Sequence, residues 1–209
     1  MNNPSRLRLA RVACLTAGLG ALLAGCATPT VDAQWRSTEL PAAYLRGATV
    51  LVSCETPELV IRRICEERVM AELNARGATP VLPAPGTVEA ARPGVADMQY
   101  LPSARDSGAK AVFSVSVGLA SQSVSPGVSL SIGGFGFGSR SAGGVGVTAP
   151  IGGGQVSSGY SANGRVTDVA SGRLMWTARA SAPPSSDVNA QLAELSKAVL
   201  DAAGKAGLF

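Results

Sequence analysis

The chain of 209 residues contains no histidine, and this absence decides most of the chemistry that its side chains could perform. Serine–histidine and cysteine–histidine relays, HExxH zinc sites and histidine proton shuttles are all excluded. Beyond the first 26 residues only Cys54 and Cys65 remain as thiols, whereas a structural zinc site needs about four ligands. A serine–lysine dyad would have to use Lys110, at the start of a predicted strand, or Lys197 or Lys205, in a predicted terminal helix. The sequence therefore predicts no enzymatic activity, metal or cofactor.

Residues 1–25 have the composition of an export signal. Arg6, Arg8 and Arg11 precede an apolar run from Val12 to Ala24. This run is well short of the roughly 20 apolar residues that a permanent membrane helix needs. It therefore suits the apolar part of a signal peptide.

The run ends in Leu23-Ala24-Gly25-Cys26, which resembles the lipobox of bacterial lipoproteins. The resemblance implies cleavage before Cys26, a diacylglycerol on its sulfur and an acyl chain, such as palmitate, on its new amino group. Small side chains suit the peptidase, and a thiolate supplies the nucleophile. An ordinary secretory signal that happens to end near Cys26 is the alternative. Ala27 stands where an aspartate usually retains Gram-negative lipoproteins in the inner membrane, so the resemblance implies the periplasmic face of the outer membrane.

Loss of the signal also changes the charge of the chain. Residues 1–25 contain three of the 18 basic residues and none of the 14 acidic residues, so the mature chain has a net charge of +1. Nucleic-acid binding thereby loses its electrostatic basis. The expected partners are the membrane, through the lipid anchor, and an unidentified envelope protein or polymer.

Residues 26–46 lack periodicity and contain two prolines, which predicts a lipidated cysteine and a tether ahead of one domain over 47–209. Trp35 is expected either at the lipid interface or folded back onto the domain. The β-branched apolar run 48–54 predicts a strand that is covered on both faces or central in its sheet.

A helix is predicted between Thr56 and Gly77, followed by a short strand over 78–82. Strand, helix and strand in this order imply a right-handed parallel crossover. Four-residue steps define the core-facing side of the helix at Ile61, Cys65, Val69 and Leu73. The charged side chains are interpreted as a solvated outer face rather than a binding patch: Arg62, Arg63, Glu66 and Glu67.

The pair Cys54 and Cys65 is predicted to join the end of the first strand to the second turn of the helix. The oxidising periplasm permits a disulfide between them. Their Cα atoms could nevertheless lie beyond the limit of roughly 7 Å. The alternative is that both are small buried hydrophobic residues.

The second half of the chain predicts antiparallel strands and a closing helix. A short helix is expected within 97–109, and a hairpin turn from Asp168 to Gly172. Strands are predicted over the alternating stretches 110–121, 155–169 and 171–181, and a helix over 188–204. Together these elements predict an α/β two-layer sandwich: a mostly antiparallel sheet opened by a β-α-β unit, with two main helices on one face.

The C-terminal half contains the pattern V-x-D-x-x-(S/T)-G-x-L-x-W, formed by Val166, Asp168, Ser171, Gly172, Leu174 and Trp176. This pattern, with the helix after it, resembles small bacterial lipoproteins that carry a domain of unknown function. The first half resembles them in its arginine-bearing helix and its Gly108-Ala109 strand entry. The resemblance covers most of the mature chain, and it implies no catalytic role for these residues.

A glycine-rich excursion occupies residues 127–154. It has no G-K-(S/T), and no G-x-G-x-x-G lies between a strand and a helix, which excludes a phosphate cradle. Two alternating arms with a bulge predict a hairpin, whereas ordering each glycine costs roughly 0.5–1 kcal/mol more than alanine, which favours a mobile loop. Insertion into a membrane by an oligomeric ring is the third alternative. In each case the candidate contact surface contains Phe135, Phe137 and Arg140.

The sequence as a whole predicts a lipid-anchored outer-membrane protein that binds or organises another envelope component without catalysis. Two alternatives stay open. One is a histidine-free serine or cysteine hydrolase, and the other is an oligomeric secretion or pore subunit that inserts the glycine-rich hairpin.

Overall fold

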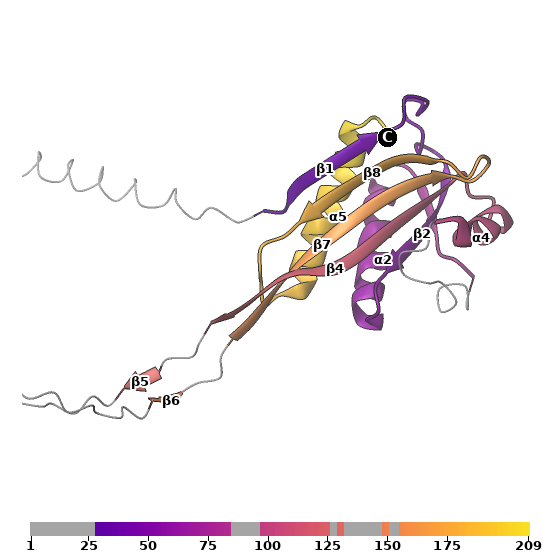
Figure 1. The fold of residues 1–209 in the computed structure, drawn as a ribbon. Coiled ribbons are helices and arrows are strands. Elements are labelled where there is room, and N and C mark those ends of the chain that lie inside the picture. Colours follow the sequence, from indigo (N-terminus) through magenta and orange to yellow (C-terminus); the bar gives the residue numbers. More distant parts are fainter. Residues whose placement is uncertain (1–27, 85–96, 126–128, 132–147, 151–154) are drawn as a thin grey trace, which may run out of the picture.

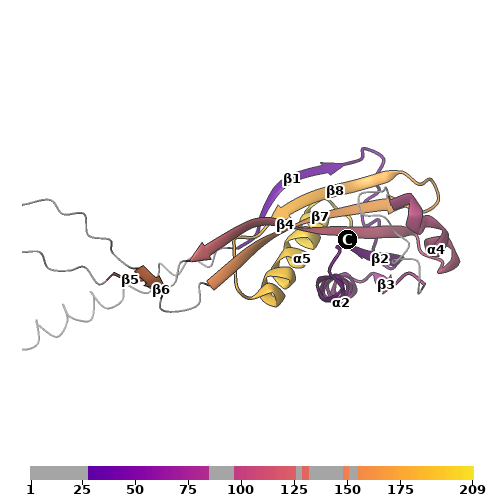
Figure 2. The ribbon, with the colours of Figure 1, turned by 60° about the horizontal axis from the view of Figure 1, so that its bottom comes forward.

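The computed structural model describes residues 28–84, 97–125, 129–131, 148–150 and 155–209. A mixed six-stranded sheet with the order β1-β8-β7-β4-β2-β3 carries two long helices on one face (Figures 1 and 2). Its strands are β1 (Thr30–Arg36), β2 (Thr49–Glu55), β3 (Thr79–Val81), β4 (Ala111–Ser125), β7 (Gln155–Asp168) and β8 (Leu174–Ser181). The helical elements are α2 (Leu59–Ala75), the 3-10 turn η1 (Asp97–Tyr100), α4 (Leu101–Asp106) and α5 (Val188–Lys205). The predicted α/β two-layer sandwich is confirmed.

The parallel crossover is formed by β2, α2 and β3. Strand β2 pairs in parallel with both β3 and β4. Its residues from Val50 to Cys54 are all buried, which explains the continuous apolar run in the sequence. Helix α2 buries Ile61 and the residues that follow it at four-residue steps.

The other strands, β4, β7, β8 and β1, pair in antiparallel order. The turn between β7 and β8 is the predicted hairpin turn: the Gly172 N–H donates to the Asp168 carbonyl at 2.8 Å. Gly172 has a φ of +69°, a conformation that glycine adopts without steric cost.

Strand β1 lies within residues 26–46, where the sequence indicated a tether. It is an edge strand, and it pairs with β8 from Thr30 to Arg36. All seven of its residues are exposed, so it has no alternation of buried and exposed positions, and backbone bonds to β8 hold it in place. Leu40 and Leu45, further along the same range, are buried in the core. The folded domain therefore begins close to residue 30.

The main core lies between the sheet and helices α2 and α5. Trp176 and Phe113 are both fully buried there, with ring centroids 6.2 Å apart. Helix α5 begins after Asp187, whose carboxylate accepts a hydrogen bond from the Ala190 N–H at 2.9 Å. A smaller cluster on the opposite face packs η1 and α4 against the sheet, and it contains Leu51, Tyr100, Leu101, Ala104 and Val112.

One of the charged residues of α2 does not point outward as predicted. Glu66 is 4% exposed and accepts a hydrogen bond from Arg63 Nη1 at 3.0 Å. Four-residue steps advance by about 40° around a helix, so the apolar stripe that begins at Ile61 has turned towards the side of Glu66 by Leu73. The prediction for Glu66 was wrong because it treated the stripe as straight.

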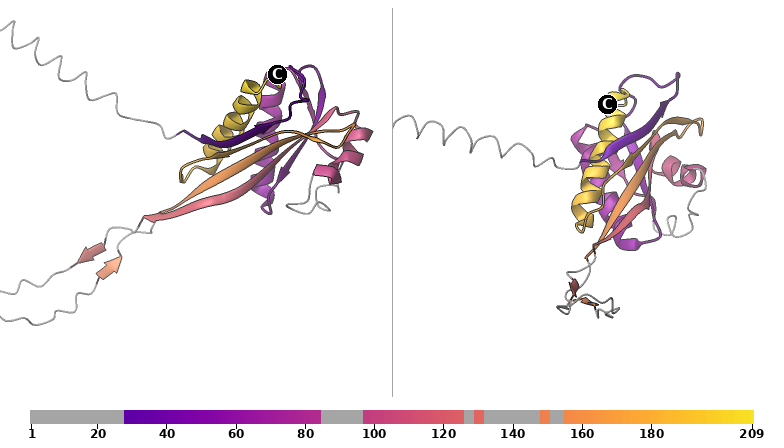
Figure 3. Two further views of the ribbon diagram at one scale, coloured as in Figure 1. Left: turned by 45° about the horizontal axis from the view of Figure 1, so that its top comes forward. Right: turned by 60° about the vertical axis from the view of Figure 1, so that its left-hand side comes forward.

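Strands β4 and β7 extend beyond their neighbours as a two-stranded ribbon (Figure 3). Strand β2 ends opposite Ser116, and β8 ends opposite Ser161. Past the ribbon, β5 (Ser129–Ser131) and β6 (Thr148–Pro150) pair in antiparallel order, as the hairpin alternative predicts. The rest of the glycine-rich excursion, including Phe135, Phe137 and Arg140, lies outside the described residues. Among the helices that are described, none is long and apolar enough to cross a membrane.

Candidate functional site

The structure joins Cys54 and Cys65 by a disulfide. Their Cα atoms are 6.1 Å apart, inside the range that a disulfide can bridge. Both residues are almost fully buried, so the bond fastens β2 to α2 within the core. Cys26 lies outside the described residues.

The face of β1, β8 and β7 that points away from the helices carries a candidate binding surface, which we term the open face: Ala33, Trp35, Asn163, Thr177 and Arg179. Trp35 lies opposite Thr177, Ala33 opposite Arg179, and Arg179 opposite Asn163. Directly opposed residues in antiparallel strands project to the same side of a sheet. These five residues line a hollow of about 260 Å³ together with Gln34 and Ala178.

The open face combines an aromatic surface with polar groups. The Trp35 side chain is half exposed, although a large indole is usually well buried. Asn163 and Arg179 are exposed beside it, and Thr177 Oγ1 donates to Asn163 Oδ1 at 3.0 Å. An indole, a guanidinium, an amide and a hydroxyl can bind a ligand through packing and hydrogen bonds. Without a neighbouring acid–base pair, this arrangement favours recognition over proton transfer.

A polar cluster centred on Asp97 lies next to the open face. The Asp97 carboxylate is 1% exposed and accepts hydrogen bonds from Ser114 Oγ and Thr167 Oγ1, each at 2.6 Å. Arg165 Nη2 lies 3.2 Å from the same carboxylate. Buried carboxylates need such partners to offset lost hydration. The cluster therefore fastens η1 to β4 and β7, and its role is structural.

A second polar cluster explains the conserved geometry of the β7–β8 turn. The Tyr44 hydroxyl donates to Asp168 Oδ1 at 2.5 Å, and the Ser171 N–H and hydroxyl donate to Oδ2 at 2.7 Å each. Burial alone would raise the pKa of Asp168, but the hydrogen bonds from Tyr44 and Ser171 outweigh it, and the pKa is lowered. Burial and the Asp168 carboxylate both raise the pKa of the Tyr44 phenol.

Ser107 precedes Lys110 by three residues, which is the S-x-x-K spacing of some serine hydrolases. This signal was missing from the sequence-based prediction. Ser107 Oγ donates to the Ala104 carbonyl at 3.1 Å, at the end of α4. Lys110 Nζ instead donates to the Tyr44 carbonyl at 2.8 Å and lies 4.3 Å from the centre of the Tyr44 ring. The two side chains thus have separate structural partners.

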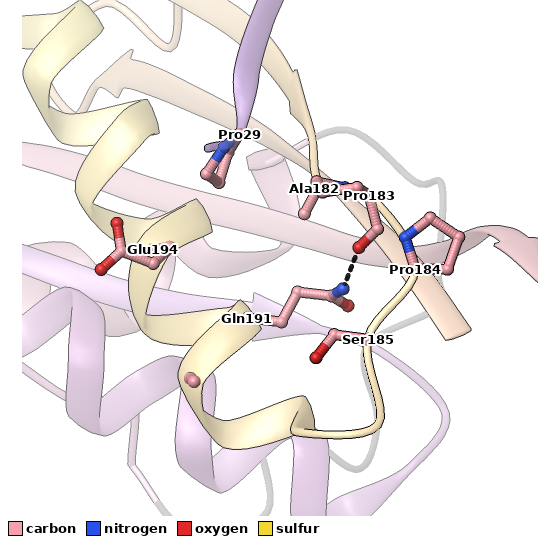
Figure 4. Close-up of a pocket in the computed structure, with 8 residues that line it drawn as sticks. Pro29, Ala182, Pro183, Pro184, Ser185, Gln191 and Glu194 are labelled. Atoms are coloured by element: carbon pink, nitrogen blue, oxygen red, sulfur yellow. Dashed lines mark hydrogen bonds between the residues drawn. The ribbon is translucent and has the colours of Figure 1, made fainter. Parts of the chain in front are cut away.

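A second pocket, of about 270 Å³, lies where the chain enters the domain (Figure 4). Its only buried polar side chain, Gln191, donates to the Pro183 carbonyl at 2.5 Å and accepts from the Tyr160 N–H at 3.1 Å. Gln191 therefore connects α5 to the ends of β7 and β8. The pocket is lined by Pro29, Ala182, Pro183, Pro184, Ser185, Ala190, Gln191 and Glu194.

No group of three or more histidine, cysteine, aspartate or glutamate side chains that could hold a metal ion occurs among the described residues. The sequence did contain a signal for the open face. In β8, Thr177 and Arg179 alternate with Trp176, Ala178 and Ala180, which places two polar side chains on the face opposite the core.

No protein-family model matches the chain, and no curated protein matches it. Two solved structures are similar in fold. One is the PelC dodecamer from Paraburkholderia phytofirmans, with 18% identity, a TM-score of 0.46, and coverage of 82% of this chain and 97% of that one. The other is the lipoprotein GNA1162 from Neisseria meningitidis, with 17% identity, a TM-score of 0.40, and coverage of 76% of this chain and 99% of that one. At these values the likeness carries no argument about function.

Proposed function

We propose that this chain is an outer-membrane lipoprotein whose periplasmic domain binds another envelope component without catalysis. The anchor is assigned to Cys26, because a basic head, a short apolar run and two small residues precede it. Several acyl chains on one cysteine would hold the domain stably at the membrane, since each buried methylene contributes about 0.8 kcal/mol.

The open face is the binding surface in this proposal. The observation that carries it is Trp35, which is 50% exposed on a sheet face beside Arg179 and Asn163. Aromatic and arginine side chains contribute most to recognition when a partner covers them. The partner is accordingly a protein or polymer of the envelope, with apolar surface for the indole and acceptor groups for the guanidinium.

The arrangement of reactive groups supports a non-catalytic role. The Asp97 carboxylate binds three side chains of the sheet, and the Asp168 carboxylate binds Tyr44 and Ser171. Lys110 is bound to the Tyr44 carbonyl. Each of these groups thus stabilises the fold, rather than activating a neighbouring serine.

Photo-crosslinking in intact cells tests the binding surface. Benzoylphenylalanine in place of Thr177 probes the open face, and the same group in place of Lys197 probes the exposed side of α5. We expect a discrete adduct from position 177 alone, and its loss when Trp35→Ala is added. Equal adducts from both positions, or none from either, would refute the open face as the binding surface.

The anchor is tested separately with Cys26→Ser. We expect the variant to lose labelling by radioactive palmitate and to leave the membrane fraction. Unchanged processing, labelling and sedimentation with envelopes would overturn the lipoprotein assignment.

A further inference from the structure

The register of the sheet places the start of β1 at the same end of the domain as the β4–β7 ribbon. Thr30 lies opposite Ser181, Ser181 opposite Ser161, and Ser161 opposite Gly118. From this row β4 and β7 continue outward as far as Ser125 and Gln155, on the side where the N-terminal chain enters (Figures 1 and 3). The chain entry and the ribbon therefore share one end of the sheet.

The anchor site lies very close to this end. Cys26 precedes Pro29, at the start of the folded domain, by three residues. Three residues span at most about 11 Å when fully extended. Acyl chains on Cys26 would therefore hold the start of β1 against the bilayer, whereas the predicted tether of 26–46 would have left the domain free to move away.

The ribbon is longer than the linker. Six residues separate Ser161 from Gln155 in β7, which corresponds to about 20 Å of strand. The ribbon thus extends farther from the row at Thr30 than the linker can separate this row from the membrane. It must meet the bilayer surface unless the whole domain tilts about Pro29.

Exposed apolar side chains gather at the same end. Val31 is 45% exposed in β1 and Leu119 is 53% exposed in the ribbon. Leu59 and Val60, at the start of α2, are 59% and 71% exposed, and they follow the end of β2 opposite Ser116 by a few residues. Leucine and valine are costly to leave in water, and a lipid interface can cover them.

The charged groups at this end are mainly acidic. Asp32 lies in β1, Glu58 precedes α2 and Asp187 precedes α5. Acidic side chains repel an anionic surface, so a zwitterionic bilayer suits this end better.

We propose that this end of the domain, defined by Val31, Leu59, Val60, Leu119 and the ribbon, lies against the lipid bilayer. The inference rests on the proposed lipid anchor at Cys26. In this orientation the strands run towards the membrane, and the open face stands roughly upright with Trp35 and Arg179 directed into the periplasm.

Fluorescence quenching by brominated lipids tests the orientation. The lipidated mature protein is placed in phosphatidylethanolamine and phosphatidylcholine vesicles with brominated acyl chains, in a Trp35→Phe background. Leu59→Trp and Leu119→Trp report on the proposed contact, and Met98→Trp is the matched control. Met98 is 65% exposed on η1, beside Asp97, which binds Ser114 and Thr167 at the other end of the sheet. Trp176 is fully buried and gives a constant signal.

We expect Leu59→Trp and Leu119→Trp to lose roughly twofold more fluorescence than Met98→Trp, because side chains at an interface lie 5–10 Å into the headgroup region. Equal quenching of all three variants in vesicle-bound protein would overturn the orientation alone. Failure of the proteins to sediment with vesicles would overturn the anchor, and the orientation with it. Matching urea midpoints of the variants establish that each is folded.

Discussion

The disulfide gives the most direct test of the folded structure. Cys54 and Cys65 are 11 residues apart, and their bond joins a central strand to the helix that covers it. A crosslink stabilises a protein mainly by restricting its unfolded chain. For a loop of this length the loop-closure expression gives about 2.8 kcal/mol at 25 °C. With a urea dependence of about 2 kcal/mol per molar, reduction should lower the unfolding midpoint by about 1.4 M.

The assay is urea unfolding followed by Trp176 fluorescence, because this side chain is fully buried in the folded domain. Both cysteines are also buried, so the bond is reduced in the unfolded state and the protein is refolded in reductant. The double variant Cys54→Ala with Cys65→Ala is the control for the bond. It should be somewhat less stable than the reduced protein, because it also loses two buried sulfur atoms.

Thiol titration decides how the comparison is read. If two free thiols appear and the urea midpoint is the same before and after reduction, the loop-closure argument is refuted. If no thiol is released on reduction of the native preparation in urea, the bond itself is absent.

Two further predictions concern single contacts. An added Cβ at Gly164 would lie 2.4 Å from Val199 Cγ1 on α5, so Gly164→Ala should destabilise the fold by about 1–3 kcal/mol in urea unfolding. Gly118→Ala meets no atom within 4 Å and is the matched control; equal losses would contradict the packing argument. Tyr44→Phe removes a hydrogen bond that lowers the pKa of Asp168. Because a lowered pKa stabilises the fold above the unfolded value of about 3.9 and less as the pH falls below it, the stability gap between wild type and variant should be constant from about pH 7 to 5 and narrow below about pH 4. A gap that is unchanged at pH 3 would refute this role of Tyr44.

Much of the fold follows from periodicity alone. The strand at Val50, the helix with Ile61 and Cys65 on its inner side, and the Asp168–Gly172 turn all lie where the sequence predicts them. These features depend on local patterns: buried runs, four-residue steps and turn residues. The order of these elements was also sufficient to predict the two-layer architecture.

The candidate site could be predicted only in part. The alternation in β8 places Thr177 and Arg179 on one face, but it does not show that a third strand brings Trp35 beside them. The exposed residues of β1 carry no pattern of their own, since the strand is held by backbone bonds to β8. In the same way, no local signal links Asp97 to Ser114 and Thr167, which are distant in sequence.

The sequence by itself determined the local elements, the charge of the mature chain, the absence of histidine chemistry and the candidate anchor at Cys26. Only the tertiary structure decided that β1 begins four residues after this cysteine and that the ribbon leaves the sheet at the same end. The physical reason is that side-chain periodicity reports which face of an element is buried, whereas strand order and register depend on backbone pairing between distant segments.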